Sequence, residues 1–345
     1  MSERMKKLIN KPEALAWELL EGLAAAYGDK LKMTGNHILV RRTPKDKGKV
    51  QILFAQGSGH EPGYQGFVGY GMHDIEVAGP IFACAGPDRI LEGIQEAWKI
   101  GGGGEILVLV ANHEGDVINN GAAVDMAQSE GIDVESILLY DDIASAPKGE
   151  ETHRRGMAGM FFAFKIAGAL AEEGANRRKI IETTQRVIDG TRTLAVAVKP
   201  CTHPMSGRPL FELADDELII GPGVHGEAGP EGPIKMMSAD TVMDKVLDKL
   251  VADGGYKTGD ELLAVLNGCG GTTLMELFIL FRRLNQDLEG RGLACHRPLV
   301  GNIMTTQEMG GFSLSLCKAD AEIKRLWDAP ADSPYFTVGR LPGSR

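Results

Sequence analysis

The stretch "KVQILFAQGSGHEP", residues 49–62, joins an apolar run to a glycine-rich turn that carries a histidine. The apolar residues predict a buried β-strand, and the glycines predict a loop at its carboxyl end. Two further apolar runs follow, "EILVLVA" (105–111) and "VESILLY" (134–140), with helical patterns at 87–100 and 119–131 before each. Strands that alternate with helices are typical of a parallel sheet in an α/β fold.

The length of the chain predicts two domains, because 345 residues exceed the size at which single cores stop growing. A new apolar run begins at "TRTLAVAVKP" (191–200), after two helical stretches that we expect at 154–174 and at 176–189. We therefore place the boundary near residue 185. The expected domains are an N-terminal α/β domain over 1–185 and a C-terminal α/β domain over 186–345, with largely parallel or mixed sheets.

The second half repeats the pattern of strand, glycine-rich turn and helix. The segment "DELIIGPGVHGEAGPEGP" (216–233) predicts a strand that runs into a loop rich in glycine and proline. The segment 260–288 predicts another strand, a glycine turn and an apolar-faced helix that packs in the core or against a second subunit. Thr272 or Thr273 is in position to cap that helix.

Composition excludes several classes of partner. The chain has 47 acidic and 37 basic residues, and its formal charge of −10 repels nucleic-acid backbones and anionic membranes. Five cysteines without C-x-x-C spacing indicate neither a disulfide framework nor a zinc site. No stretch of about 20 apolar residues occurs. We expect a cytoplasmic protein that acts on a small metabolite.

Three loops that follow apolar strands are candidates for chemistry, since ligands of open α/β sheets bind at the carboxyl ends of strands. In the first loop, Gly57 and Gly59 allow close approach to the main chain, and His60 is able to bond a hydroxyl or move a proton. The alternative is a tight turn with a surface histidine. The loop lacks the third glycine of a dinucleotide fingerprint, so a nucleotide site is not indicated.

The second loop is "NHEGD", residues 112–116, in which Asp116 is a candidate general base for a hydroxyl. Its alternative role is that of a helix N-cap, which is common for aspartate. The third loop contains His225 and Glu227, where a neutral imidazole is a nucleophile toward a carbonyl and a carboxylate fixes its tautomer. Asp141 and Asp142 form a possible carboxylate pair for a metal, although a solvated turn at a strand end is the favoured interpretation.

A series of motifs resembles the ketose-binding subunit of the dihydroxyacetone kinase family, and the match runs in order from Lys6 to Phe336. The motifs are "MKKLINKPE" (5–13), "GSGHEP" (57–62), "GFVGYGM" (66–72), N-x-x-G-D (112–116), "RRGMAG" (154–159), "KIAGALAEEG" (165–174), "GVHGEAG" (223–229), "MTTQEMGGFSLSL" (304–316) and "LWDAPADSPYF" (326–336). The resemblance implies a homodimer of two-domain α/β subunits with the substrate bound between the domains.

The resemblance also implies roles for individual residues. His225 forms a covalent hemiaminal with the ketone carbon, and Asp116 acts as the base on the terminal hydroxyl. His60 hydrogen-bonds the substrate and assists proton transfer, while the main chain over Gly57, Ser58 and Gly59 holds its hydroxyls. No metal or cofactor is implied on this chain.

Several positions depart from the family pattern. Relatives usually have a substrate-contacting lysine directly before the asparagine of N-x-x-G-D, and this chain has Ala111. The two residues after that asparagine, commonly Tyr-Thr, are His113 and Glu114, and Gln56 replaces a glycine just before "GSGHEP". These departures predict a retuned pocket, which favours a larger ketose such as the four-carbon erythrulose, or a related modified sugar, over dihydroxyacetone.

The family requires a helical nucleotide-binding domain, which this sequence lacks. We therefore expect ATP or ADP, with magnesium, on a separate partner subunit. The donor is either ATP itself or an ADP recharged by a phosphocarrier, and the sequence leaves both open. The alternative function is that of a ketose-sensing paralogue that regulates transcription without catalysis. Asp116 favours the kinase, and the missing lysine favours the sensor or a change of substrate.

Overall fold

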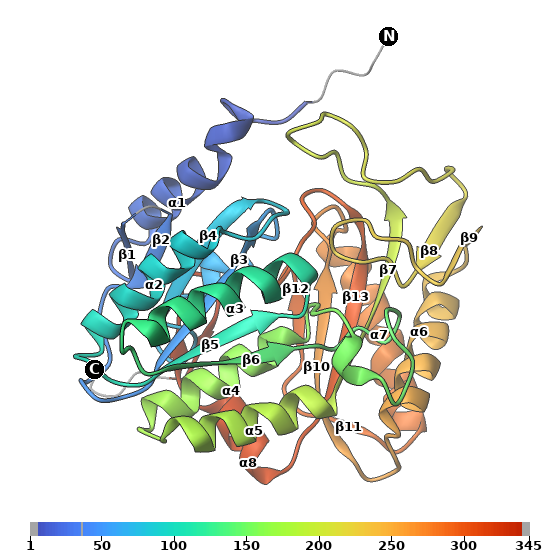
Figure 1. Cartoon of the computed structure of the whole chain (residues 1–345). Helices are drawn as coiled ribbons and strands as arrows, with labels where there is room; N and C mark the ends of the chain where they lie inside the picture. Colours follow the sequence, from blue (N-terminus) through green and yellow to red (C-terminus); the bar gives the residue numbers. More distant parts are fainter. Residues whose placement is uncertain (1–5, 36, 340–345) are drawn as a thin grey trace. The chain divides into compact units, whose positions relative to one another are not determined.

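The computed structural model describes residues 6–35 and 37–339 of the chain. These residues form two compact units, each with a β-sheet of its own (Figure 1). Unit 1 contains residues 6–8, Tyr140–Phe161 and Val187–Lys324, and unit 2 contains Ile9–Leu139, Phe162–Arg186 and residues 325–339. Each unit thus includes residues from both sides of the predicted boundary near residue 185.

The described part of unit 2 contains a sheet of six strands in the order β1-β2-β4-β3-β5-β6. Their bounds are β1 Leu31–Thr34, β2 Ile38–Arg41, β3 Gln51–Ser58, β4 Ile75–Ile81, β5 Ile106–Ala111 and β6 Val134–Leu139. The neighbours β3, β5 and β6 are parallel, as predicted. The strand β4, which the sequence analysis did not predict, also runs parallel to β3, and β1 and β2 add an antiparallel edge. The sheet is therefore mixed.

Helices cover the sheet of unit 2. On one face, α2 (Pro87–Ile100) and α3 (Glu114–Ser129) lie side by side over the strands, and side chains such as Leu53, Ile94 and Val108 form the core beneath them (Figure 1). The side chain of Phe54 points to the opposite face, where its ring lies 4.8 Å from that of Phe164. This second face carries the polar residues described below.

The described part of unit 1 contains a mixed sheet in the order β11-β10-β13-β7-β8-β9, in which β12 also pairs with β10. Its strands are β7 Thr191–Lys199, β8 Glu217–Ile220, β9 Glu231–Lys235, β10 Glu261–Gly268, β11 Ala294–Cys295, β12 Leu299–Gly301 and β13 Gly310–Lys318. Most neighbours are antiparallel, and only β11 and β12 run parallel to β10. The predicted fold class, α/β with largely parallel or mixed sheets, is confirmed.

Helices α6 (Ala239–Gly254) and α7 (Leu274–Gly290) pack together on the sheet of unit 1 (Figure 1). Thr273 caps α7, as predicted: its hydroxyl accepts the N–H of Glu276, and the Glu276 carboxylate accepts the N–H of Thr273 at 2.8 Å. Leu277 and Leu284 on α7 are fully buried. The helix therefore packs in the core of unit 1, and its role in subunit contact stays a prediction.

The remaining elements complete the two units and connect them. They are α1 Leu15–Ala26, α4 Met160–Glu172, α5 Arg177–Gly190, α8 Ala321–Asp328 and the short strands β14 Ala331–Asp332 and β15 Thr337–Val338. Among the described residues, no helix combines the length and the apolar character needed to span a membrane.

Two predicted helix bounds are wrong. The helix expected over 154–174 begins only at Met160, because the segment before it is bound to a neighbouring carboxylate: the Gly159 N–H donates to Asp141 at 2.9 Å. A Cβ at Gly159 would lie 2.6 Å from Thr191, so only glycine fits there. The helix expected from residue 119 begins at Glu114, five residues earlier.

Candidate functional site

The loop after β3 holds His60 in the interior of unit 2. Its side chain is 0% exposed, and its ring meets those of Tyr64 edge-on at 5.9 Å and Phe82 at 5.3 Å between centroids. The alternative of a surface histidine in a tight turn is therefore wrong. Aromatic contacts limit the orientations of the imidazole, which suits a residue that must present a nitrogen to a substrate in one direction.

The glycines before His60 are required by packing within the chain. A Cβ at Gly57 would lie 2.7 Å from the backbone nitrogen of Ala83. Gly59 has a φ of +107°, and a Cβ there would lie 2.6 Å from the Phe82 ring. The segment that approaches the glycine main chain in this structure is thus the turn after β4.

Polar groups of the same loop are engaged inside unit 2. The Ser58 hydroxyl donates to the Gly79 carbonyl at 2.8 Å, and the Gly59 N–H donates to the Glu61 carboxylate at 2.8 Å. Burial raises the pKa of Glu61, although the Gly59 N–H opposes the shift. Hydrogen bonds from this main chain to a substrate stay a prediction.

Asp116 lies in the first turn of α3 and is 5% exposed. The N-cap of the helix is His113, so the alternative in which Asp116 is the cap is wrong. Its backbone carbonyl accepts the side-chain N–H of Asn120 at 2.9 Å, one helical turn on. The carboxylate is thereby held on a regular helix, which gives a candidate general base a defined position.

Gln56 reaches the carboxylate of Asp116 from β3. With its amide nitrogen turned toward Asp116, it donates to both carboxylate oxygens, at 2.7 Å from Oδ2. Phe54 lies opposite Leu109 in the parallel ladder, so Gln56 and Ala111, each two residues further on, lie on the same face of the sheet. Gln56 therefore lies on the same face as position 111, one of the departures from the family pattern noted above.

A second carboxyl group, Glu76 on β4, is buried on this face. Both of its oxygens, and both ring nitrogens of His73, have no hydrogen-bond partner among the described residues. His73 Nε2 lies 3.2 Å from Glu76 Oε2, a close contact that lacks the alignment of a hydrogen bond. Burial, and then the charge of Asp116, raise the pKa of Glu76 well above its ordinary value, and burial lowers the pKa of His73 to about 3. Both side chains are thus biased toward their neutral forms.

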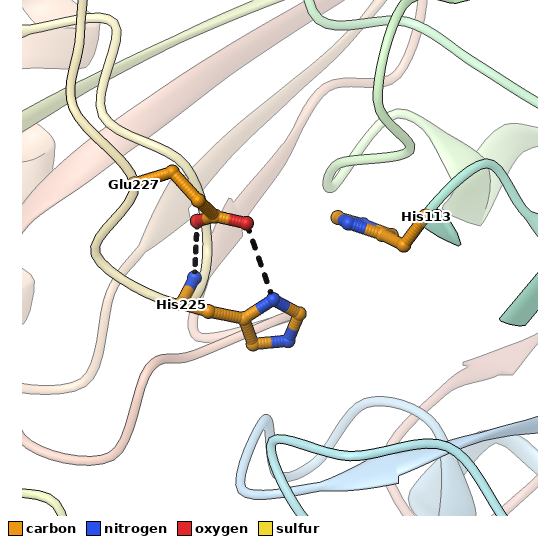
Figure 2. A group of neighbouring side chains, drawn as sticks. All are labelled: His113, His225 and Glu227. Carbon is orange, nitrogen blue, oxygen red and sulfur yellow. Dashed lines mark hydrogen bonds and ion pairs between the residues drawn. The ribbon is translucent and has the colours of Figure 1, made fainter. Parts of the chain in front are cut away.

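His225 stands in the loop between β8 and β9 of unit 1. The Glu227 carboxylate accepts the backbone N–H of His225 at 2.8 Å, and its other oxygen lies 3.3 Å from the ring Nδ1 (Figure 2). Burial acts to raise the pKa of Glu227, but the hydrogen bond and charge of His225 outweigh it and hold that pKa well below its ordinary value. The side chain of His225 is 23% exposed. The expected support of His225 by Glu227 is present.

Asp141 and Asp142 are both buried, so their interpretation as a solvated turn is wrong. Asp141 accepts the N–H groups of Met157 at 2.6 Å and Gly159 at 2.9 Å, and burial raises its pKa to about 7. Asp142 forms an ion pair with Arg155 at 2.7 Å. These partners account for both carboxylates without a metal ion.

The structure adds two residues to which sequence reasoning gave no role: Glu76, whose carboxyl group is influenced by the charge of Asp116, and Arg155, which lies near Glu227. For Gln56, which the sequence marked as a departure from the family pattern, the structure adds the bond to Asp116. The sequence does contain a sign that Glu76 is unusual. In "DIEVAG" (74–79) a carboxylate interrupts an apolar run that has the pattern of a buried strand. Among the described residues, neither unit by itself brings together three His, Cys, Asp or Glu side chains at the spacing of a metal site.

Comparison with known proteins identifies relatives along most of the chain. The signature of the Dak1 domain family matches residues 21–335. The "PTS-dependent dihydroxyacetone kinase 1, dihydroxyacetone-binding subunit DhaK" of Listeria innocua is 36% identical over 318 residues, which cover 92% of this chain and 95% of that protein. The "L-erythrulose kinase" of Pectobacterium atrosepticum is 37% identical over 344 residues, which cover 98% of this chain but only 58% of that protein.

A solved structure with the same fold is the "Dihydroxyacetone kinase operon co-activator Dha-DhaQ". It superposes with a TM-score of 0.87 at 31% sequence identity and covers 94% of this chain and 98% of its own. The family thus includes proteins named as kinase subunits and a protein named as a co-activator.

Proposed function

Because this chain belongs to the Dak1 domain family, we propose that it is the ketose-binding subunit of a dihydroxyacetone-type kinase. It captures a short-chain ketose covalently on His225 and presents the terminal hydroxyl of the ketose for phosphorylation. The observation that carries the proposal is the contact of Glu227 with Nδ1 of His225 at 3.3 Å. With the ring proton on Nδ1, the lone pair that attacks a carbonyl carbon lies on Nε2.

The capture step exchanges one bond for another. The Nε2 lone pair forms a bond to the ketone carbon, and the π electrons of the carbonyl move to its oxygen. The ring is then positive. Its Nδ1 proton is lost to solvent and the alkoxide takes up one proton from solvent, while Glu227 stays ionised beside the ring. The product is a neutral hemiaminal. The low pKa of Glu227 keeps a negative charge beside the ring as the positive charge develops.

Asp116 and His60 act on the hydroxyl side of the same substrate. Asp116 removes the proton of the terminal hydroxyl as that oxygen attacks the phosphoryl group. His60 hydrogen-bonds the ketose and assists the transfer. The main chain over Gly57, Ser58 and Gly59 binds further hydroxyls. These roles come from the family resemblance, and the burial of Asp116 and His60 on fixed elements supports them.

The substrate we propose is a four-carbon ketose such as erythrulose. Ala111 and Gln56 take the places of a lysine and a glycine in relatives, and Gln56 bonds Asp116. The amide donates hydrogen bonds without a positive charge, so the contacts to the terminal hydroxyl differ from those of a lysine. The similarity to the L-erythrulose kinase of Pectobacterium atrosepticum is consistent with this choice.

The phosphoryl donor in this proposal is bound by a partner. A helical subunit holds ATP, or an ADP that a phosphocarrier recharges, together with magnesium, and docks on a homodimer of this chain. The partner supplies the phosphoryl chemistry, and this chain supplies the nucleophilic hydroxyl in a fixed orientation.

A crystal of this chain soaked with erythrulose tests the capture directly. We expect continuous density from Nε2 of His225 to a tetrahedral carbon, and no such density with erythritol, which has no carbonyl. Density for an intact planar ketone beside His225 would contradict the covalent step. Phosphorylation of the bound ketose by an added nucleotide-binding subunit then tests the kinase role.

The second candidate function is ketose sensing, which the superposition on a co-activator favours. A sensor requires capture by His225 but has no use for a base at position 116. A chain that captures ketose, binds a transcription regulator and fails to support phosphorylation with any nucleotide-binding partner would establish the sensor.

A further inference from the structure

Arg155, in the segment before α4, is fixed within unit 1 by its main chain and by its side chain. Its carbonyl accepts the N–H groups of Asp141 and Asp142, each at 3.1 Å, and its own N–H donates to the Ser145 hydroxyl at 2.9 Å. The guanidinium donates twice to one oxygen of Asp142, from Nε at 2.9 Å and from Nη2 at 2.7 Å. The planar fork then has one orientation.

The third nitrogen of the guanidinium faces the loop of His225. Arg155 Nη1 lies 4.0 Å from Glu227 Oε2, the oxygen that also accepts the backbone N–H of His225. Gly223 lies between them: a Cβ there would be 2.1 Å from Glu227 Oε2 and 2.5 Å from Arg155 Nη1. The glycine is therefore what allows the carboxylate and the guanidinium to approach each other.

We infer that Arg155 is a positioning residue for ketose capture, which holds the Glu227 carboxylate so that its Oε1 faces Nδ1 of His225. The inference deepens the proposed function and rests on it. Glu227 Oε2 accepts the His225 N–H at 2.8 Å and faces the Arg155 guanidinium at 4.0 Å, so that Oε1 is left directed at the ring. Asp142 is the first group in this series of contacts, because its two hydrogen bonds fix the orientation of the Arg155 guanidinium.

The charge order along this chain suits the capture step. In space the groups follow the order Asp142, Arg155, Glu227 and His225. Their charges alternate in sign once the His225 ring becomes positive during attack on the ketone. Each group thereby has an opposite charge as its neighbour, and the positive charge on the ring is stabilised as it forms. A lysine at position 155 keeps the positive charge. Its single ammonium group, however, lacks the planar geometry with which the guanidinium bonds Asp142 and faces Glu227 at the same time.

A purely structural role for Arg155 is the competing explanation, because Asp142 is buried and needs a cation. Burial raises the pKa of Asp142, and the charge of Arg155 opposes that shift. Removal of the guanidinium would leave a buried carboxyl unpaired and risk unfolding. The test therefore uses Arg155→Lys, which keeps a cation near Asp142, and Gly223→Ala, which separates Arg155 from Glu227 and deletes neither.

The experiment measures ketose binding by this chain alone, with erythrulose labelled at its carbonyl carbon. Carbon NMR reports conversion of the planar carbonyl into a tetrahedral carbon, and calorimetry gives Kd. We expect Arg155→Lys and Gly223→Ala each to weaken binding on the order of tenfold, because each disturbs the ion pair that orients Glu227. The matched controls Arg283→Lys, from a surface pair with Asp244, and Gly290→Ala, whose Cβ meets nothing, should bind like wild type.

Coupling to Glu227→Gln separates positioning from structure. If Arg155 acts through Glu227, the double variant Arg155→Lys/Glu227→Gln binds no more weakly than Glu227→Gln alone. Wild-type affinity in both Arg155→Lys and Gly223→Ala, or fully multiplicative losses in the double variant, would overturn the inference while leaving capture intact. Failure of the wild type to form the tetrahedral carbon would overturn the proposed function, and the inference with it.

Discussion

The loop of His225 in unit 1 and the surroundings of Asp116 in unit 2 use charge in opposite ways. His225 is partly exposed and supported by an alternating series of charges through Glu227 and Arg155. Asp116 is buried and bonded to the neutral amide of Gln56, and its charge helps to raise the pKa of the neighbouring Glu76 carboxyl group. The surroundings of His225 favour the ionised form of Glu227, whereas the surroundings of Asp116 disfavour a second negative charge on Glu76.

This difference matches the chemistry proposed for each region. A nucleophile that becomes positive needs an adjacent carboxylate that stays ionised, together with access for the substrate. A base that accepts a proton works best where a second negative charge is unfavourable. The two regions are therefore separable by mutation, and each of the following changes alters one while leaving the other intact.

Asp116→Asn should have the largest effect. It removes the proposed base, so phosphorylation of the ketose with the partner subunit should fall by about 10² to 10⁴, while capture by His225 is retained. Steady-state kinetics and calorimetry on the same preparations measure the two properties. Asp125→Asn, an exposed change on the same helix, is the control. Turnover that survives in Asp116→Asn would assign this residue a structural role.

Substrate preference should respond to a smaller degree. The double variant Ala111→Lys/Gln56→Gly restores the family pattern, and we expect its preference to shift toward dihydroxyacetone over erythrulose by about tenfold, the size of one hydrogen bond to a charged group. Ala111→Lys alone should shift less, because Gln56 occupies the same face. A wild type that already prefers dihydroxyacetone in kcat/KM would remove the basis for the proposed substrate.

Glu76→Gln should change stability rather than chemistry. The folded pKa of Glu76 lies above the ordinary 4.5, so its contribution to stability is fully present below about pH 4.5 and is lost as pH rises through the folded value. The variant lacks this loss, so its stability relative to wild type should increase as pH rises toward neutral.

Urea unfolding at several pH values measures the effect, with the exposed Glu21→Gln as the control. The free-energy difference between wild type and Glu76→Gln should grow as pH rises. A difference that is the same at every pH would mean that Glu76 does not carry the proton that its burial favours.

The sequence was informative where local pattern decides structure. Apolar runs that alternate with helical patterns located β3, β5 and β6. Thr273 was one of two predicted caps, because capping depends on neighbouring residues. Prediction from the sequence failed where a residue distant in the chain determines the local structure. The start of α4 depends on Asp141, and the burial of Asp142 depends on Arg155, thirteen residues away. The amide of Gln56 was visible as a departure from the family, but its bond to Asp116 required the fold.

The central claim is covalent capture of a ketone by His225, and the most direct measurement is the affinity of wild type and His225→Ala for erythrulose and for erythritol. The account predicts that wild type binds the ketose much more tightly than the polyol, and that His225→Ala binds both equally weakly with an unchanged thermal midpoint. Equal affinity of wild type and His225→Ala for erythrulose would contradict the claim.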